Sequence, residues 1–400
     1  MGLNDTPGSE RTHIGFFGST NAGKSSLVNA VTDQDLAIVS EIKGTTTDPV
    51  TKSMEILPLG PVVVIDTPGF DDDSALGNAR MAKAKQCLNK TDIDVLVIDE
   101  DLGKTALDNE LEALVKSKNI PYIICHNKCD KVSDIKEIPG EIYVSTLTGK
   151  GINELKEAIG RLGSENSTEK HLVADLINPG DNLVLVIPID ESAPKGRIIL
   201  PQQQMIRDIL DSNATCVCCQ PEELAGVISS FKNPPRMVIT DSQAFSEVAA
   251  ATPKEIPLTS FSILLARYKG FLETAVKGAT AIKTLKDGDI ILMAEGCTHH
   301  RQCQDIGTVK IPNLLRKVTG KNLTFETVSG TEYPDEETLS KYAMVIHCGA
   351  CMTTEREVTY RMKCTVDACI PFTNYGITLA YLKGILPRSI ELFPDLHKLL

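Results

Sequence analysis

A glycine-rich loop at residues 18–25 constrains the fold of this chain more than any other feature. The segment GSTNAGKS directly follows the apolar run HIGFF and precedes a helix-like stretch. A strand, a glycine-rich loop and a helix in this order turn backbone N–H groups toward the oxygens of a bound phosphate. The sequence therefore predicts an α/β fold that begins with a P-loop domain built on a mainly parallel sheet.

The side chains of this loop fit a nucleoside triphosphate with its metal ion. Gly18 and Gly23 let backbone N–H groups turn toward phosphate oxygens. Lys24 can reach the β and γ phosphates, and the Ser25 hydroxyl can ligate magnesium. The loop residues that we expect at the nucleotide are Gly18, Asn21, Ala22, Gly23, Lys24, Ser25 and Ser26.

Two residues of a later segment complete the phosphate end of this site. Asp66 follows the apolar run VVVI in the segment DTPG, where a carboxylate can hold the magnesium ion through water. Gly69 in the same segment can direct an N–H group at the γ phosphate. A strand end is thus expected to bring both residues to the edge of the sheet that carries the glycine-rich loop.

Selectivity for guanine is predicted from two further segments. Asn127, Lys128 and Asp130 in NKCD follow the strand-like run YIIC. The Asp130 carboxylate can accept the two donors on the guanine edge that adenine does not offer. Ser145 in STLTG follows the strand-like run EIYV and matches the remaining base-contacting loop. GTP and GDP are therefore the expected nucleotides, and the chain is expected to be a GTPase.

A second group of residues lies far from these motifs. Cys297 and His299 stand in CTHH, and after a gap of 47 residues His347, Cys348 and Cys351 stand in HCGAC. Cysteines with two residues between them let one loop hold a metal, and Cys297 must join from another loop. On these residues alone, an iron–sulfur cluster, a zinc ion and buried thiols that only fill space all remain open.

The alternation of apolar runs and helical stretches predicts three domains. Residues 1–165 form the GTPase domain, and a polar linker at 163–171 separates it from a small α/β domain at 172–260. Residues 261–400 form a third α/β domain, in which the Cys and His residues lie just past the ends of predicted strands, where open α/β sheets bind ligands. We find no internal repeat of fixed period.

Charge and hydropathy exclude several classes of partner. Lys and Arg number 41 and Asp and Glu number 53, so the net charge is −12, and no basic run offers a surface to nucleic acid or to anionic membranes. No apolar stretch is long enough to span a membrane, and the N-terminal residues lack the pattern of a signal peptide. We expect a cytoplasmic protein whose 12 cysteines are thiols or metal ligands.

With its nucleotide motifs in this order, the segment from residue 12 to 162 resembles the GTPases of the Era and MnmE type. The resemblance implies that GTTTD, residues 44–48, is the first switch, and that Thr46, or Thr45 as the alternative, meets magnesium in the GTP state. It also implies that Asn21 helps to hold a stimulating potassium ion. Phe70 replaces the water-positioning glutamine of Ras-like enzymes, so we expect slow intrinsic hydrolysis. The expected catalytic residues are Lys24, Thr46, Asp66 and Gly69, and the expected magnesium ligands are Ser25 and Thr46.

The combination of GTPase motifs, CTHH, HCGAC and the final segment PFTNYGITLAYLKGIL resembles the HydF family of FeFe-hydrogenase maturation GTPases along essentially the whole chain. The resemblance implies a 4Fe-4S cluster on Cys297, Cys348 and Cys351, with an exchangeable fourth ligand that is His299, His347 or an oxygen donor such as Asp305. It further implies that residues 172–260 form a dimerisation domain, that the chain is a homodimer, and that the third domain binds the cluster.

This resemblance also implies a role as a scaffold or carrier. The protein would hold a di-iron precursor, made with the radical-SAM enzymes HydE and HydG, and deliver it to apo FeFe-hydrogenase. The alternatives are a tRNA-modifying or ribosome-associated GTPase, which the acidic charge disfavours, and a GTP-gated zinc-binding regulator. Zinc would give none of the absorption and EPR signals of an iron cluster, so spectroscopy separates the last alternative from the first.

Overall fold

The computed structural model describes residues 6–33, 50–69, 86–166, 170–189, 196, 198–296, 305–330 and 333–400. The chain divides into two compact units, residues 1–168 and 169–400, and each is described by itself. Three of the predicted site residues, Thr46, Cys297 and His299, lie outside the described ranges, as does Thr45. The division into three domains stays a prediction.

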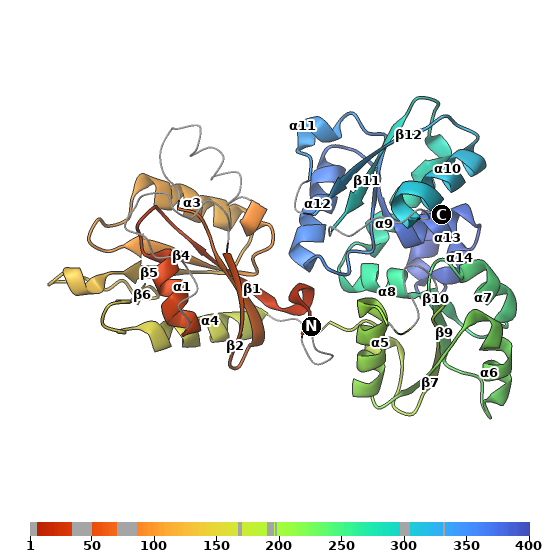
Figure 1. The fold of residues 1–400 in the computed structure, drawn as a ribbon, viewed down its shortest axis with the longest axis horizontal. Coiled ribbons are helices and arrows are strands. Elements are labelled where there is room, and N and C mark those ends of the chain that lie inside the picture. The colour runs from red at the N-terminus through yellow and green to blue at the C-terminus, as the bar shows by residue number, and fades with distance from the viewer. Residues whose placement is uncertain are drawn as a thin grey trace. The chain divides into compact units, whose positions relative to one another are not determined.

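The first unit is an α/β layer structure on a six-stranded sheet of order β2-β3-β1-β4-β5-β6 (Figure 1). Four of its five pairings are parallel, as predicted, whereas β2 pairs with β3 in antiparallel register. The sequence analysis did not foresee this edge strand. The strands are β1 (Thr12–Phe17), β2 (Val50–Ile56), β3 (Gly60–Asp66), β4 (Ile93–Asp99), β5 (Tyr122–Asn127) and β6 (Ile142–Tyr143), and the helices are α1 (Lys24–Thr32), α3 (Ala106–Ser117) and α4 (Ile152–Asn166).

Two apolar cores bury the two faces of this sheet. Leu27 of α1 and Leu155 of α4 pack with the side chains of one face, while Leu111 of α3 packs with those of the other. Neighbouring residues of a strand point to opposite faces, which is why the almost wholly apolar strands predicted from the sequence fit a sheet covered on both sides. Helix α4 continues to Asn166, so the helix takes in the start of the predicted linker.

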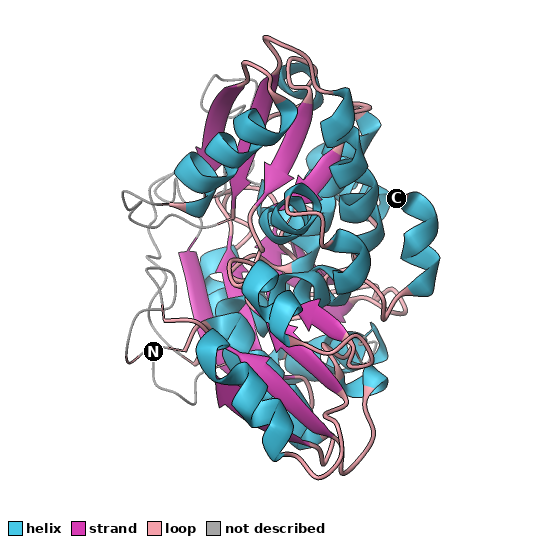
Figure 2. Cartoon of the chain, turned by 90° about the vertical axis from the view of Figure 1, so that its right-hand side faces the viewer, coloured by secondary structure: helices cyan, strands magenta, loops and turns pink. Residues whose placement is uncertain are grey.

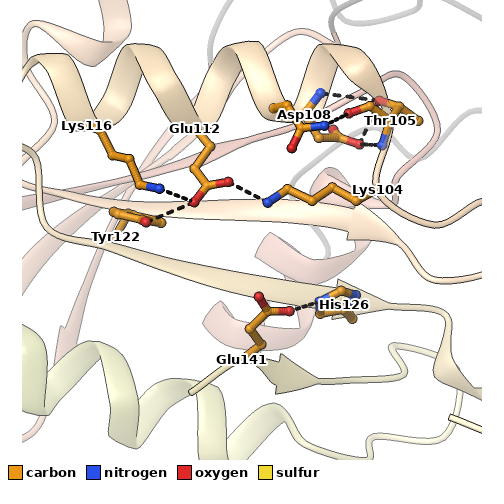
Figure 3. Close-up of polar contacts among 9 residues, drawn as sticks. Lys104, Thr105, Asp108, Glu112, Lys116, Tyr122, His126 and Glu141 are labelled. Atoms are coloured by element: carbon orange, nitrogen blue, oxygen red, sulfur yellow. Dashed lines mark hydrogen bonds and ion pairs between the residues drawn. The ribbon is translucent and has the colours of Figure 1, made fainter. Parts of the chain in front are cut away.

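Local polar contacts define the start and the exposed side of α3. Thr105 caps the helix, because its hydroxyl accepts from the Asp108 N–H at 3.3 Å and the Asp108 carboxylate accepts from the Thr105 N–H at 2.9 Å (Figure 3). Such a capping box stabilises a helix start by about 1 kcal/mol. Glu112 then contacts Lys116 and Tyr122, which ties the helix to the beginning of β5.

The second unit contains two four-stranded sheets, of order β10-β9-β7-β8 and β12-β11-β13-β14, and every pairing in both is parallel. Figure 2 shows them as two sets of strands with helices between them. The strands are β7 (Asn182–Val186), β8 (Thr215–Cys219), β9 (Met237–Thr240), β10 (Leu258–Ser260), β11 (Ile290–Glu295), β12 (Thr324–Ser329), β13 (Met344–His347) and β14 (Phe372–Asn374). The helices are α5 (Leu200–Asp211), α6 (Leu224–Ser230), α7 (Phe245–Ala251), α8 (Phe261–Tyr268), α9 (Leu272–Thr280), α10 (Ile311–Thr319), α11 (Glu336–Leu339), α12 (Glu355–Asp367), α13 (Tyr375–Leu382) and α14 (Leu386–Ser389).

These two sheets are repeats of one architecture. With the strands of each sheet counted along the sequence, the first strand lies between the second and the third, and the fourth pairs with the third. The segment IPLTSFSILLARYKG contains the fourth strand and the following helix of the first sheet, and IPFTNYGITLAYLKG contains those of the second. The third strands, MVIT and MVIH, are also alike. We call the part from β7 to α8 the first repeat and the part from β11 to α13 the second repeat. The spacing between equivalent residues changes from strand to strand, which is why no fixed period is visible in the sequence.

Equivalent hydrogen bonds occur just after the third strand of each repeat. The Asp241 N–H donates to the Val186 carbonyl at 3.4 Å in the first repeat, and the Cys348 N–H donates to the Ala294 carbonyl at 2.7 Å in the second. Ser260 and Asn374 cap α8 and α13 in the same way. A single apolar core joins the two repeats, with buried residues from both sheets and from α8, α9 and α13. None of the described helices is long and apolar enough to cross a membrane.

Candidate functional site

The phosphate loop has the geometry that its sequence predicts. Gly18 and Gly23 have φ angles of 149° and 87°, and a Cβ on Gly18 would lie 2.2 Å from the Val97 carbonyl oxygen. Both positions therefore require glycine. Lys24 begins α1, and its ammonium donates to the carbonyls of Gly18 and Ser19 at 2.9 and 2.8 Å. The lysine is thus held over the inside of the loop, where a phosphate chain would lie.

Ser25 and Asp66 meet at the predicted magnesium position. The Ser25 hydroxyl donates to Asp66 Oδ2 at 2.7 Å, and Asp66 Oδ1 is buried without a hydrogen-bond partner. Burial raises the pKa of Asp66, and the Ser25 hydroxyl and the nearby charge of Lys24 oppose the shift. A buried carboxylate oxygen without a donor beside a serine hydroxyl suits a hard divalent cation, so these two residues fit magnesium.

The segment that follows Asp66 packs against the phosphate loop. A Cβ on Gly69 would lie 2.4 Å from the Thr20 hydroxyl, so only glycine fits there. This close approach places the Gly69 backbone next to the phosphate loop. Its proposed contact with a phosphate stays a prediction.

The first guanine segment is tied directly to the phosphate loop. The Asn127 side chain donates to the Ala22 carbonyl at 3.0 Å, and the Lys128 ammonium donates to the Asn21 carbonyl at 2.6 Å. Lys128 also contacts Asp99, at the end of β4, at 2.5 Å. These bonds join residues that are far apart in the sequence, so the base-binding and phosphate-binding loops form one site.

The second guanine segment positions the base-reading carboxylate. The Ser145 hydroxyl donates to Asp130 Oδ1 at 2.5 Å, and the Thr148 N–H donates back to the Ser145 hydroxyl at 3.1 Å. The Ser145 hydroxyl thus holds one oxygen of the Asp130 carboxylate. The predicted residues Asn127, Lys128, Asp130 and Ser145 are therefore brought together as the sequence analysis expects.

His126 is a residue of this region that the sequence analysis missed. Its ring stacks on Tyr143 with the centroids 4.5 Å apart, and one ring nitrogen lies 2.6 Å from Glu100. The other ring nitrogen lies 2.5 Å from Glu141 (Figure 3). It directly precedes Asn127, and Tyr143 closely precedes Ser145, so the stack links the two guanine segments. No motif signals this role, because the contacts come from three separate strand ends.

The loop from Cys348 to Thr353, which we call the cysteine loop, follows β13 at the carboxyl edge of the sheet of the second repeat. Strands β11 and β13 pair with Ala294 opposite His347, so both strands end at the same edge. There the Gly296 N–H donates to the Cys348 sulfur at 3.2 Å. Burial raises the pKa values of the Cys348 and Cys351 thiols, and the Gly296 N–H opposes the shift at Cys348.

The cysteine loop itself is tightly built. Ala350, between the two cysteines, has a φ of 58°, a left-handed conformation that is uncommon for a residue with a side chain. A Cβ on Gly296 would lie 1.9 Å from the Thr353 hydroxyl, which is buried without a hydrogen-bond partner. Within the described ranges, which omit residues 297–304, no three Cys, His, Asp or Glu side chains form a metal-binding group.

Both ring nitrogens of His347 have partners inside the protein. Its Nδ1 lies 2.9 Å from the Cys348 carbonyl, and its Nε2 lies 3.3 Å from an Arg361 nitrogen. Burial, together with the charge of Arg361, lowers the pKa of His347 to about 4, so the ring is neutral. Since both ring nitrogens are engaged inside the protein, this geometry disfavours His347 as the fourth ligand.

Oxygen donors also approach this edge. Asp305 Oδ1 accepts from the Thr308 N–H at 2.7 Å and so caps the next helical turn. Glu295, the last residue of β11, is buried and accepts from the Tyr375 hydroxyl at 3.4 Å. The sequence analysis did not single out Glu295 or Tyr375. A charged residue at the end of an apolar strand was the available signal.

Three family models match successive parts of the chain. The model described as a 50S ribosome-binding GTPase matches residues 13–128, the hydrogen maturase F dimerization domain matches residues 172–270, and the hydrogen maturase F tetramerization domain matches residues 273–392. The two maturase models together cover more than half of the chain.

Curated relatives match about two fifths of the chain. The tRNA modification GTPase MnmE of Parasynechococcus marenigrum (strain WH8102) is 33% identical over 162 residues, which are 40% of this chain and 36% of that protein. The MnmE of Legionella pneumophila (strain Corby) is 35% identical over 161 residues, 39% of this chain and 36% of that protein. The chain thus spans about a third of the length of these relatives, and the likeness supports the GTPase class.

Solved structures of GTPases also match. One is Era in complex with MgGDPNP and a segment of 16S ribosomal RNA, 21% identical, with a TM-score of 0.36 over 52% of this chain and 93% of that chain. Another is a variant of Era from Aquifex aeolicus bound to GDP and AlF4-, 18% identical, with a TM-score of 0.35 over 81% of this chain and 94% of that chain. With TM-scores this low, the assignment rests on the family models and on the geometry of the site.

Proposed function

The chain belongs to the hydrogen maturase F (HydF) family of hydrogenase maturation GTPases, and from this premise we propose that it carries a 4Fe-4S cluster and delivers a di-iron precursor to apo FeFe-hydrogenase. The observation that supports this role best is the contact of the Gly296 N–H with the Cys348 sulfur. It places the cysteine loop beside the chain that leads into Cys297.

The cysteine loop suits such a cluster. Cys348 and Cys351 supply two thiolates from one loop, and Cys297, two residues beyond β11, is the proposed third. A backbone N–H at a thiolate sulfur stabilises its charge and tunes the potential of a cluster. When bound, the cluster supplies one iron whose fourth ligand can exchange, and His299 or an oxygen donor such as Asp305 is the proposed occupant of that position.

The GTPase unit is proposed to control the exchange of partners. Lys24, Ser25 and Asp66 are the proposed residues that hold the phosphates and magnesium, which their contacts at the phosphate loop support, and Thr46 is the proposed further magnesium ligand. Potassium stimulation through Asn21 is part of this proposal. GTP turnover would then change how the protein binds its partners and would do no chemistry on iron.

Oligomers are part of the family's architecture, because its two matching models are named for dimerization and tetramerization. We propose a homodimer built on the first repeat as the basic form. The proposed protein partners are the radical-SAM enzymes HydE and HydG, which would make the precursor, and apo FeFe-hydrogenase, which would receive it.

Activation of apo-hydrogenase tests the delivery role. The protein is reconstituted with iron under anaerobic conditions, loaded with a di-iron complex and mixed with apo FeFe-hydrogenase, and hydrogen evolution is measured. We expect activity from the loaded protein and none from the di-iron complex alone at the same concentration. Cys369→Ser is the control for Cys348→Ser in this assay. It should activate the hydrogenase like the unaltered protein, because Cys369 is exposed and lies outside the cysteine loop.

Two results would count against this role. A protein that takes up zinc but no iron would favour the zinc-binding alternative. A protein that assembles the cluster and still fails to activate the hydrogenase would remove the delivery step and leave the cluster assignment standing.

A further inference from the structure

Lys269 is a buried cation in contact with the cysteine loop. It directly follows α8 of the first repeat and is 1% exposed. Its ammonium donates to the Ala350 carbonyl at 2.9 Å and to the Thr353 carbonyl at 2.5 Å. The first repeat therefore supplies a positive charge to the loop of the second repeat that carries Cys348 and Cys351.

Burial of an ammonium group is costly, so such a residue needs compensation from its surroundings. Removing a lysine ammonium from water is unfavourable unless hydrogen bonds and opposite charge offset the loss of hydration. The two loop carbonyls offset part of this cost. A set of thiolates around a cluster at the same loop would add the negative charge that favours a lysine here.

The other repeat contains the matching lysine without the cysteines. Lys383 directly follows α13, and its ammonium donates to the Gln243 carbonyl at 2.9 Å. Gln243 of the first repeat is equivalent to Ala350 of the second, because each is the third residue after the third strand of its repeat. Each repeat thus reaches into the loop of the other with a lysine. The loops themselves differ, because Cys348 and Cys351 stand where the first repeat has Asp241 and Ala244.

We propose that Lys269 is a positioning residue for the cluster, which fixes the conformation of the loop from Cys348 to Cys351 and raises the reduction potential of the bound cluster. The inference rests on the proposed function. A reduced cluster carries more negative charge than an oxidised one, so a buried cation beside it favours the reduced form. The charge acts on the electron affinity of the cluster, and the two hydrogen bonds act on the shape of the loop.

Redox titration of the full-length protein tests this role. The unaltered protein, Lys269→Met and the control Lys383→Met are reconstituted with iron, and the EPR signal of the reduced cluster is followed against the applied potential. We expect Lys269→Met to shift the midpoint to a more negative potential and to lower iron occupancy, while Lys383→Met leaves both unchanged. An unchanged midpoint in Lys269→Met, or equal shifts in both variants, would overturn the inference.

Two further variants guard against a folding defect. If Lys269→Met does not fold, Lys269→Arg and Lys269→Gln are compared, since both are polar and only the first keeps the charge. The inference predicts the more negative midpoint in Lys269→Gln, and equal midpoints would overturn it. Failure of the unaltered protein to assemble a cluster would instead overturn the proposed function, and this inference with it.

Discussion

The two repeats of the second unit share a backbone and differ in chemistry. Strand order and the helix caps are the same in both, and a lysine that follows the last helix of each repeat contacts the loop of the other. Yet β9 is followed by Asp241 and Ser242 where β13 is followed by Cys348 and Gly349. The carboxyl edge of a parallel sheet can change its side chains while the hydrogen bonds that define the sheet persist. The comparison therefore separates what maintains the fold from what supplies the function.

The largest expected effect concerns the residue after the third strand of each repeat. Cys348→Ser should remove nearly all of the roughly four irons of the cluster and leave GTP hydrolysis nearly intact, as measured by iron content, absorption and phosphate release. Asp241→Ser, at the equivalent place, should keep the iron. Lys24→Ala should do the reverse of Cys348→Ser, losing hydrolysis and keeping the cluster. A complete cluster in Cys348→Ser would show that the ligand assignment is wrong.

Arg361 forms a buried ion pair in the second repeat. It is 1% exposed, contacts Glu357 at 2.5 Å and lies beside His347, on a helix of 13 residues where the first repeat has the seven-residue α7. Arg361→Met removes the guanidinium from beside the buried Glu357 carboxylate, so we expect a loss of about 3–5 kcal/mol in urea unfolding.

The first repeat offers the matched control for that loss. Arg236 is half exposed and lies 3.9 Å from Asp181, so Arg236→Met should cost less than about 1 kcal/mol. Similar losses for Arg361→Met and Arg236→Met would mean that the buried pair contributes no more than a surface pair.

Gly376 and Ser262 stand at equivalent places and contact each other. A Cβ on Gly376 would lie 1.9 Å from the Ser262 hydroxyl oxygen, so Gly376→Ala should destabilise the unit by about 1–3 kcal/mol through overpacking. The double variant Ser262→Gly/Gly376→Ala should recover much of this loss in thermal unfolding. Failure to recover it would place the strain elsewhere.

The helix caps should give the smallest and most equal effects. The Ser260 hydroxyl accepts from the Ile263 N–H at 3.3 Å, and Asn374 Oδ1 accepts from the Ile377 N–H at 2.8 Å. Ser260→Ala and Asn374→Ala should each cost about 1 kcal/mol in urea unfolding. A loss in one variant alone would break the equivalence of the two caps.

The nucleotide site could be predicted in detail because its chemistry follows from short motifs. Gly18 lies in the loop between β1 and α1, and Lys24 begins α1, since a strand, a loop and a helix in succession leave few arrangements open. Asp66 ends β3 and contacts Ser25. The roles of these residues at a nucleotide stay predictions. The antiparallel strand β2 and the stack of His126 on Tyr143 could not be predicted in this way, because each depends on contacts between distant segments.

The order of the α/β elements, the GTPase motifs and the presence of two cysteines in one short loop could be read from the amino-acid sequence, because these depend on residues close together in the chain. The tertiary structure alone decided that β11 and β13 end side by side, that His347 turns toward Arg361, and that Lys269 of one repeat reaches the cysteine loop of the other. The reason is physical: strand pairing and core packing join residues separated by tens of positions, and burial then decides which polar groups each side chain can meet.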